Sequence, residues 1–273
     1  MELDAISTHG LVLLGCGKMG TAMLDGWLTA GLPPAAVYVI DPHPTAQLQQ
    51  LVGSGLNLNE ALPEAPAICV LAVKPQLMDA ALPAVTHMGG GRTLVLSVAA
   101  GTPVARFEQA FGAQTPIIRA MPNTPAAIGQ GITALVGNAA ATERHMGLAE
   151  DVFAGIGQSV RLDSEAQIDA VTGLSGSGPA YVFHLVECMA QAGEAEGLPS
   201  EMAMKLAVAT VAGAGALAAQ PGASAAQLRV DVTSPNGTTQ AGLEQLMNQQ
   251  TGLLPLIRRT VAAAAARSRA LSR

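Results

Sequence analysis

Residues 11–20 read Leu-Val-Leu-Leu-Gly-Cys-Gly-Lys-Met-Gly, four aliphatic residues followed at once by the pattern G-x-G-x-x-G. A helical pattern then runs to about Ala30 and is closed by Gly31. In this setting the first glycine permits a tight turn, the second lets a pyrophosphate approach the backbone, and the third lets the helix pack on its strand. A glycine-rich turn without a ligand is the alternative. The position at the start of a βαβ unit favours a dinucleotide site.

Short aliphatic runs alternate with helical patterns on both sides of this motif. The runs predicted as strands are 11–14, 37–40, 68–73, 93–98 and 117–121, with a further pair near 132–136 and 159–162. Runs that are apolar on both faces are typical of a parallel sheet covered by helices. From about Glu165 onward the pattern is helical. We therefore predict an α/β fold with a Rossmann-like doubly wound sheet over residues 1–164, followed by an all-α domain over 165–273.

Composition excludes several classes of function. Of the 273 residues 49% are hydrophobic and 12% charged, the net charge is −6, and no cluster of Lys and Arg indicates a nucleic-acid partner. Because so little of the surface is charged, oligomer contacts are expected. The three cysteines are far apart and show no metal-ligand or redox spacing, so we expect reduced thiols, no metal site and a cytoplasmic location. Residues 206–228 are uncharged but hold Pro221, which favours a packed helix and loop over a membrane span.

Two strand ends after the glycine motif carry side chains that could meet a cofactor. Asp41 ends the second strand about twenty residues after the motif, where an acid can hydrogen-bond ribose hydroxyls and repel a 2′-phosphate. This position favours NADH, but Asp41 before Pro42 is equally well interpreted as a turn residue. Lys74 ends the third strand, where a solvent-facing terminus is the simpler interpretation.

The helical part holds two further motifs. Residues 169–181 read Asp-Ala-Val-Thr-Gly-Leu-Ser-Gly-Ser-Gly-Pro-Ala-Tyr, a helix interrupted by small residues and restarted with Pro179 in its first turn. A simple helix kink is the alternative. Residues 234–239 read Ser-Pro-Asn-Gly-Thr-Thr before a helix predicted over about 240–247. Hydroxyls and free amides at a helix N-terminus suit a small carboxylate, although a plain Thr N-cap explains them equally well.

These motifs, in order and spacing, resemble the pyrroline-5-carboxylate reductase family. The resemblance rests on residues 15–20, 73–75, 97–101, 119–125, 169–181 and 234–239, and spans nearly the whole chain. It implies NADPH- or NADH-dependent reduction of the cyclic imine 1-pyrroline-5-carboxylate to L-proline. It also implies an active site between an N-terminal Rossmann-like domain and a helical domain that interlocks with a second subunit, giving a homodimer that can assemble into a larger homo-oligomer.

The resemblance also implies site residues. Cofactor contacts fall on Gly15, Cys16, Gly17, Lys18, Met19, Gly20, Asn59, Ala72, Val73, Lys74, Pro75, Ala99 and Ala100, to which we add Asp41. Substrate contacts fall on Glu165, Asp231, Ser234, Gly237, Thr238 and Thr239. The chain departs from the family at Asp41-Pro42, where NADPH-dependent members have a small polar residue often followed by a basic one. It also has Asp231 for a common asparagine and Asn236 for a common glycine, and Asn tolerates positive φ.

The expected chemistry needs alignment more than a dedicated acid or base, because a protonated cyclic imine is already a strong electrophile. None of the five histidines lies in a motif. Thr239 is the candidate for a catalytic hydroxyl near the ring nitrogen. Two alternatives are a β-hydroxyacid dehydrogenase and a nucleotide-binding regulator without catalysis. The first requires a lysine in the helix that opens the second domain, whereas Lys205 lies well beyond it.

Overall fold

The computed structural model describes residues 3–271, with the side chains described from Ala5 onward. Within that range the chain divides into two compact units, one formed by Met1–Gly176 with Ala264–Arg273 and the other by Ser177–Ala263. The boundary expected after residue 164 lies earlier than this division and stays a prediction.

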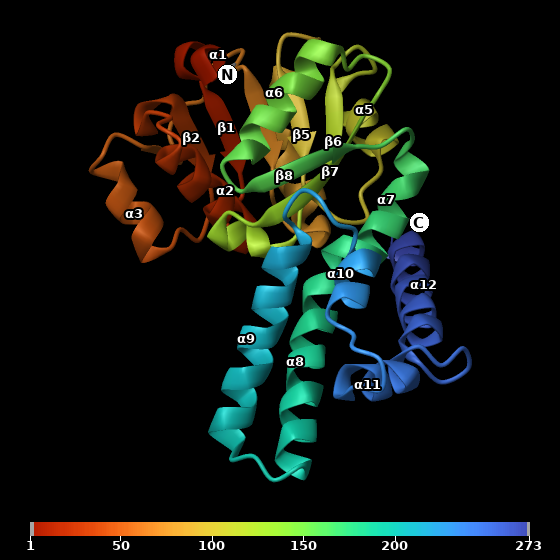
Figure 1. The fold of residues 1–273 in the computed structure, drawn as a ribbon. Coiled ribbons are helices and arrows are strands. Elements are labelled where there is room, and N and C mark those ends of the chain that lie inside the picture. Colours follow the sequence, from red (N-terminus) through yellow and green to blue (C-terminus); the bar gives the residue numbers. More distant parts are fainter. Residues whose placement is uncertain (1–2, 272–273) are drawn as a thin grey trace. The chain divides into compact units, whose positions relative to one another are not determined.

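The first unit is built on one sheet (Figure 1). Its strands in the described chain are β1 (Leu11–Leu14), β2 (Val37–Ile40), β3 (Asn57–Leu58), β4 (Ile68–Leu71), β5 (Leu94–Ser97), β6 (Ile117–Met121), β7 (Gly131–Gly137) and β8 (Gly157–Arg161). They are ordered β3-β2-β1-β4-β5-β6-β7-β8, and all neighbours are parallel except β6 and β7. This confirms the predicted doubly wound fold. The order reverses between β1 and β4, which is where open α/β sheets bind ligands.

Helices cover both faces of this sheet. They are α1 (Leu3–His9), α2 (Lys18–Thr29), α3 (Ala46–Val52), α4 (Met78–Ala81), α5 (Val104–Phe111) and α6 (Glu143–Ala154). The short helix α7 (Ile168–Val171) follows β8. Alternate residues of β1 enter different cores, since Leu11 and Leu13 pack with α2 and α6 while Val12 and Leu14 pack with α4 and α5. The Trp27 indole donates to the Val152 carbonyl at 2.8 Å and so joins α2 to α6. Burial of β1 on both faces explains its unbroken apolar run.

The predicted and observed elements differ in three places. β3 is two residues long and lies at the sheet edge, so it leaves no apolar run to detect. β7 runs antiparallel to β6 because the connection over 122–130 holds a short 3₁₀ turn, Thr124–Ile128, where a parallel pair would need a longer crossover. The helix expected from about residue 240 begins earlier, at Thr238.

The second unit is helical, as predicted. It contains α8 (Gly178–Ala195), α9 (Ser200–Ala218), α10 (Ala225–Asp231), α11 (Thr238–Leu246) and the first part of α12 (Leu253–Leu271). Pro179 lies in the first turn of α8, directly after a π-helical segment, Thr172–Gly176. α8 and α9 lie side by side in Figure 1 and meet through small residues, with Ala190, Ala203 and Ala207 buried between them.

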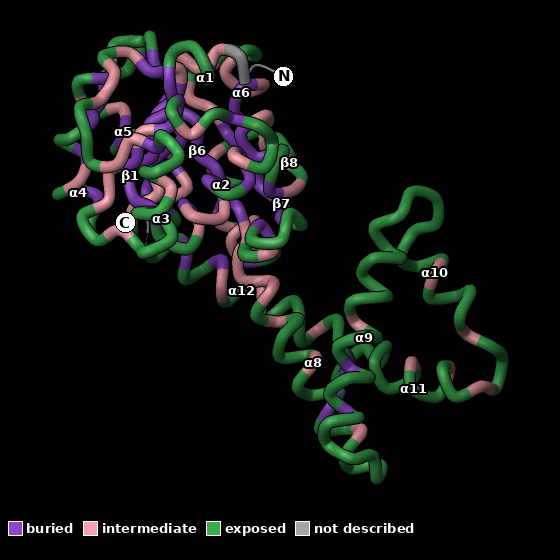
Figure 2. Tube along the Cα trace, turned by 90° about the vertical axis from the view of Figure 1, so that its left-hand side faces the viewer, coloured by how far each residue is buried: buried purple, intermediate pink, exposed green. Residues whose placement is uncertain are grey.

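Most of the second unit is exposed, in contrast to the first (Figure 2). Large apolar side chains lie open along α8 and α9, including Phe183 at 64% exposed, Leu206 at 51% and Val208 at 50%. By length and composition alone α9 would also qualify as a membrane span. An apolar surface of this extent indicates a protein partner or a membrane.

Candidate active site

The glycine motif adopts three different backbone environments. Gly15 has φ +87°, and a Cβ there would lie 2.7 Å from the Val73 Cγ1 atom. A Cβ on Gly20 would lie 2.6 Å from the Gly15 carbonyl oxygen, so the start of α2 packs closely on the turn. Gly17 is the N-cap of α2, and a Cβ there would meet open space. The arrangement therefore has the tight turn, the close packing and the open backbone that a pyrophosphate site needs.

A cavity of about 530 Å³ lies beside this motif, at the carboxyl ends of β1, β2 and β4. Of the predicted cofactor residues, its lining includes Gly15, Gly17, Asp41, Asn59, Ala72, Val73 and Lys74. The lining also includes His43 and, from the α4 region, Leu77, Ala80, Ala81 and Ala84. The α4 residues were missed by sequence reasoning, because no motif covers residues 77–84. Among the described residues, the other predicted cofactor contacts lie outside this lining.

Asp41 is fixed by an unusually complete set of hydrogen bonds. Its Oδ2 accepts the Cys16 backbone N–H at 2.7 Å, and its Oδ1 accepts the His43 N–H at 2.8 Å. Asn59 holds the backbone of Asp41 from the other side: its Oδ1 accepts the Asp41 N–H at 2.9 Å and its Nδ2 donates to the Asp41 carbonyl at 2.8 Å. The carboxylate is thus both a turn residue and a fixed acid at the rim of the cavity. The role of Asp41 as a turn residue is therefore compatible with its proposed role as a ribose-binding acid.

The Cys16 thiol within the glycine motif is buried. Burial raises the pKa of this thiol, and the nearby Asp41 carboxylate raises it further, while a hydrogen bond with Thr21 acts in the opposite direction. A thiol with a raised pKa stays protonated at neutral pH and is a poor nucleophile. Cys16 therefore contributes its backbone amide, not its sulfur, to the site.

The β5–α5 loop, residues 98–103, carries the predicted contacts Ala99 and Ala100. Ala99 is buried and Ala100 exposed. Glu165, predicted from the family resemblance to contact substrate, forms an ion pair with Arg119, with 2.7 Å between Glu165 Oε1 and Arg119 Nη1. Sequence reasoning missed this role of Arg119, because nothing in the local pattern marks a strand arginine as buried.

The second unit carries the predicted substrate turn, residues 234–239. Asn236 has φ +60°, a positive φ that asparagine tolerates. Gly237 is the N-cap of α11, and its N–H donates to the Ser234 carbonyl at 3.0 Å. Thr238 and Thr239 occupy the exposed first turn, where helix geometry leaves backbone amides without intrahelical acceptors. Because the N-cap of α11 is Gly237 and no side chain caps the helix, the alternative of a plain Thr N-cap is wrong. Asp231 ends α10, and its carboxylate accepts the Gln227 side-chain amide at 2.7 Å.

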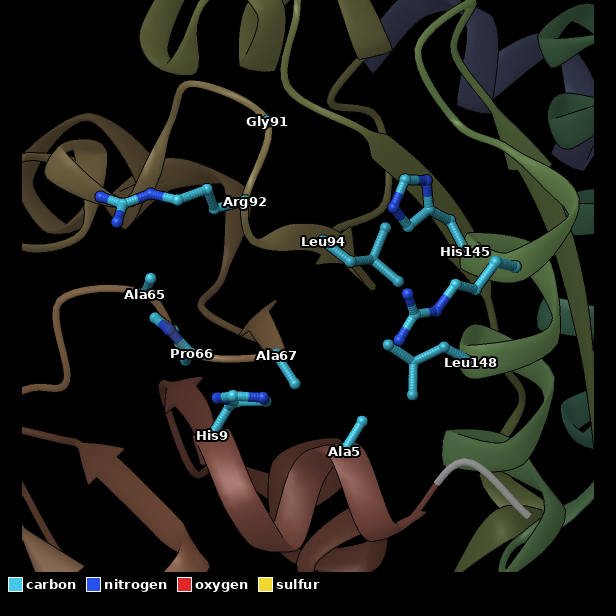
Figure 3. A pocket seen from close by; sticks show the side chains of 11 residues that line it. Ala5, His9, Ala65, Pro66, Ala67, Gly91, Arg92, Leu94, His145 and Leu148 are labelled. Carbon is cyan, nitrogen blue, oxygen red and sulfur yellow. The ribbon is translucent and has the colours of Figure 1, made fainter.

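A different cavity lies at the amino ends of β1, β4 and β5 (Figure 3). Its volume is about 400 Å³, and His9, Arg92 and His145 contribute to its lining. Arg92 pairs with the exposed Glu64 at 3.2 Å. This cavity therefore lies at the opposite end of the strands from the glycine motif. Ligands of open α/β sheets bind at the carboxyl ends of the strands.

Comparison with known proteins agrees with the fold and the motifs. A family model described as pyrroline-5-carboxylate reductase dimerisation matches residues 165–271, and one described as NADP oxidoreductase, coenzyme F420-dependent, matches residues 10–101. The dimerisation match indicates a homo-oligomer. The chain is 38% identical over 271 residues to a pyrroline-5-carboxylate reductase of Pseudomonas aeruginosa, covering 98% of each protein.

Solved structures extend the comparison. A pyrroline-5-carboxylate reductase of Coxiella burnetii superposes with a TM-score of 0.90 at 30% identity, covering 97% of this chain and 99% of that one. A pyrroline carboxylate reductase of Plasmodium falciparum with NADP bound superposes with a TM-score of 0.81 at 25% identity, covering 98% and 99%. Since whole-chain identity, fold and both motif regions agree, this chain belongs to the pyrroline-5-carboxylate reductase family.

Proposed function

We propose that the protein reduces 1-pyrroline-5-carboxylate to L-proline with a nicotinamide dinucleotide. The observation that carries the proposal is the 234–239 turn, which opens α11 with exposed hydroxyls and first-turn amides. The first unit supplies a cavity built on a dinucleotide motif. A cofactor site together with a receptor for a small carboxylate is what a reductase of a cyclic imino acid requires.

The residues of the first unit fit the cofactor. Gly17 leaves open space next to the N-terminus of α2, where amide donors and the helix dipole favour a pyrophosphate. Asp41 and Asn59 stand at the rim where the adenine ribose would lie. Val73, Lys74 and Pro75 follow the end of β4, and Ala99 and Ala100 follow β5. We assign all of these positions, with the rest of the motif over 15–20, to cofactor binding.

The fixed Asp41 carboxylate favours NADH over NADPH. A 2′-phosphate on the ribose would approach a carboxylate whose two oxygens are already held by backbone amides, so the acid cannot turn away without losing both bonds. Like charges about 4 Å apart repel by roughly 1–4 kcal/mol, depending on the local dielectric. Lys74 also lines this cavity, but it follows β4, whereas Asp41 follows β2.

On the substrate side, amides at the start of α11 and the Thr238 hydroxyl hold the carboxylate, with Ser234 and Gly237 shaping the turn. Thr239 places its hydroxyl near the ring nitrogen, where it accepts a hydrogen bond from the protonated imine. We also assign Asp231 to the substrate side, as the family resemblance implies. The bound nicotinamide supplies the hydride. Because the protonated imine is already activated, alignment of its ring carbon is the main contribution of these residues.

We further propose that the working form is a homodimer, able to assemble further, and that it acts in the cytoplasm. The exposed apolar residues of α8 and α9 support the dimer, because such a surface is rarely left open to water.

A steady-state assay with the cyclic imine tests the proposal. With NADH and NADPH in parallel, we expect imine-dependent oxidation of the cofactor, faster with NADH at equal concentration. Replacing Thr239 by Ala should lower kcat roughly 10- to 100-fold, since hydrogen bonds to charged groups contribute about 1.5–3 kcal/mol. Thr239→Ser, which keeps the hydroxyl, should recover most of the rate. No turnover by the unmodified protein with either cofactor contradicts the proposed function, and unchanged kinetics in Thr239→Ala removes Thr239 from the mechanism.

A further inference from the structure

One carboxylate oxygen joins the β5–α5 loop to a buried arginine. Glu165 lies in a 3₁₀ turn, Glu165–Gln167, that directly precedes α7. Its Oε1 accepts the Val104 backbone N–H at 2.8 Å and the Arg119 Nη1–H at 2.7 Å. Val104 is the first residue of α5, and Arg119 lies in β6. The side chain of Glu165 thus contacts two elements, α5 and β6, that are distant from it in sequence.

Both partners need this carboxylate for physical reasons. α5 follows Pro103, whose side chain has no acceptor, and no side-chain hydrogen bond caps the helix locally. Helix N-termini are stabilised by an acceptor for their free amides and by negative charge. The side chain of Arg119 is 6% exposed, against 34% for that of Glu165, and a buried guanidinium requires a paired anion. Glu165 therefore serves as a remote cap for α5 and as the counter-charge for Arg119.

The same loop is held at two other points. The Ser97 hydroxyl oxygen accepts the Ala99 N–H at 3.2 Å, which fixes the start of the loop. Gly101 has φ +74°, and a Cβ there would lie 3.4 Å from the Leu271 Cβ, so the end of α12 lies against the loop. The end of α12 is in turn bonded to α7, because the Ser268 hydroxyl donates to Asp169 Oδ1 at 2.6 Å.

These contacts close a ring around the loop within the first unit. Asp169 follows Glu165 by four residues, so one short segment holds α5 through Glu165 and the end of α12 through Asp169. The end of α12 then meets the loop at Gly101. Loops of this length are ordinarily mobile, but this one is fixed at its start, at its end and along one side.

We propose that Glu165, paired with Arg119, is a positioning residue that holds the β5–α5 loop in the conformation that binds the nicotinamide dinucleotide. The inference rests on the proposed function, in which Ala99 and Ala100 of this loop contact the cofactor. Glu165 then acts through the loop, and its removal weakens cofactor binding even when no imine is present. A residue that only contacted substrate would leave that binding unchanged.

The test is a titration of NADH and NADPH against variants in the absence of imine, together with thermal unfolding. Glu165→Ala should raise the Kd of the better-bound cofactor roughly tenfold. Glu165→Gln should recover part of the affinity, because its amide oxygen still accepts the Val104 N–H although the charge that pairs with Arg119 is lost. Ser268→Ala, which removes the bond to Asp169, should raise the Kd about two- to threefold and keeps the test open if Glu165→Ala fails to fold. Glu64→Ala, which breaks an exposed ion pair with Arg92, is the matched control and should bind as the unmodified protein does.

The possible results separate this inference from the proposed function. If the unmodified protein binds cofactor and the folded Glu165 variants bind it equally well, the positioning role is wrong and the proposed function stands. A raised KM for the imine with an unchanged cofactor Kd assigns Glu165 to direct substrate contact and also overturns the inference. Equal loss of affinity in Glu165→Ala and Glu165→Gln overturns the capping explanation. If the unmodified protein binds neither cofactor, the proposed function itself fails.

Discussion

The proposed preference for NADH depends on a single side chain, Asp41. Asp41 is held by the amides of Cys16 and His43, so its charge faces the rim of the cavity without freedom to rotate. The sequence predicted an acid at this position but could not separate a ribose ligand from a turn residue. In the structure one oxygen accepts the turn amide of His43 and the other accepts the amide of Cys16 in the glycine motif, so Asp41 is a turn residue, and its contact with a ribose stays a prediction.

Asp41→Asn should therefore change cofactor selectivity while leaving the turn intact. Asparagine keeps one acceptor oxygen and removes the charge, so we expect the ratio of kcat/KM for NADH to that for NADPH to fall roughly tenfold, about 1.4 kcal/mol. The measurement is steady-state kinetics with each cofactor at saturating imine. The exposed Asp163→Asn is a suitable control for the loss of one charge. An unchanged ratio would show that the ribose lies away from Asp41.

Gly17 and Gly15 have different reasons to be glycine. A Cβ on Gly15 would collide with Val73, whereas a Cβ on Gly17 would meet open space. Gly17→Ala should thus fold normally, with unfolding free energy within about 0.5 kcal/mol of the unmodified protein, but its methyl group would stand where the pyrophosphate approaches. We expect at least about a tenfold rise in the cofactor Kd.

Gly147→Ala is the matched control, because Gly147 lies in α6 and a Cβ there also meets open space. Titration and thermal unfolding of both variants give the comparison. Normal cofactor affinity in Gly17→Ala would place the pyrophosphate elsewhere.

At the scale of elements, Arg161 joins β8 to α6. Its guanidinium bonds to Glu150 through Nε and Nη2 at 2.7 and 2.9 Å, and to Glu143 through Nη1 at 2.5 Å. The hydrogen bond from Arg161 is the main cause that lowers the pKa of the Glu150 carboxyl below its ordinary value. Because the folded pKa is the lower one, this contribution to stability is complete above the ordinary pKa of Glu and is lost as pH falls through the lowered value.

Arg161→Met should accordingly lower Tm at pH 7, and the difference from the unmodified protein should shrink as the pH falls below the ordinary pKa of a Glu carboxyl, about 4.3. Thermal unfolding at a series of pH values measures this difference directly. Glu143→Gln should reproduce only part of the effect, since Glu150 keeps its two bonds. A difference that stays constant down to pH 3 would mean that Glu150 does not contribute through this pair.

Sequence patterns predicted the helices and strands far better than the contacts between elements that are far apart in the sequence. Apolar runs identified β1 and β4 because both strands are buried on both faces, and the glycine spacing identified the start of α2. The 234–237 turn was predicted from its Pro, Asn and Gly residues, whereas a substrate role for residues 234–239 was implied by the family resemblance and not by the residue types alone. The link from Glu165 to Arg119 spans 46 residues, and the contact of Leu271 with Gly101 joins the chain end to the middle. No local pattern encodes such pairs, since they arise from packing.

At the scale of the whole molecule, the helices α8 and α9 combine small buried residues with large exposed apolar ones. Ala190, Ala203 and Ala207 let α8 and α9 approach closely, while large side chains on their outer faces stay open. The matching dimerisation family model covers this region. Burial of an apolar exterior against another subunit stabilises such a helical pair.

Leu206→Glu should disrupt this association. Leu206 lies on α9 and is 51% exposed, so a charge there costs little in a monomer and much in an apolar interface. Light scattering after size-exclusion chromatography should show a loss of the oligomer at micromolar concentration. Gln220→Glu, an exposed polar position just beyond α9, should leave assembly unchanged. An oligomer of unaltered mass in Leu206→Glu would locate the interface elsewhere.

The most direct test of the reductase assignment follows a labelled hydride. The protein is incubated with 1-pyrroline-5-carboxylate and NADH in which both hydrogens at the nicotinamide C4 position are deuterium, and the product is separated on a chiral column and analysed by NMR. The expected result is L-proline carrying deuterium on the ring carbon that formed the C=N bond, in equal amount to the NADH oxidised. Oxidation without L-proline, or L-proline without deuterium at that carbon, would contradict the assignment.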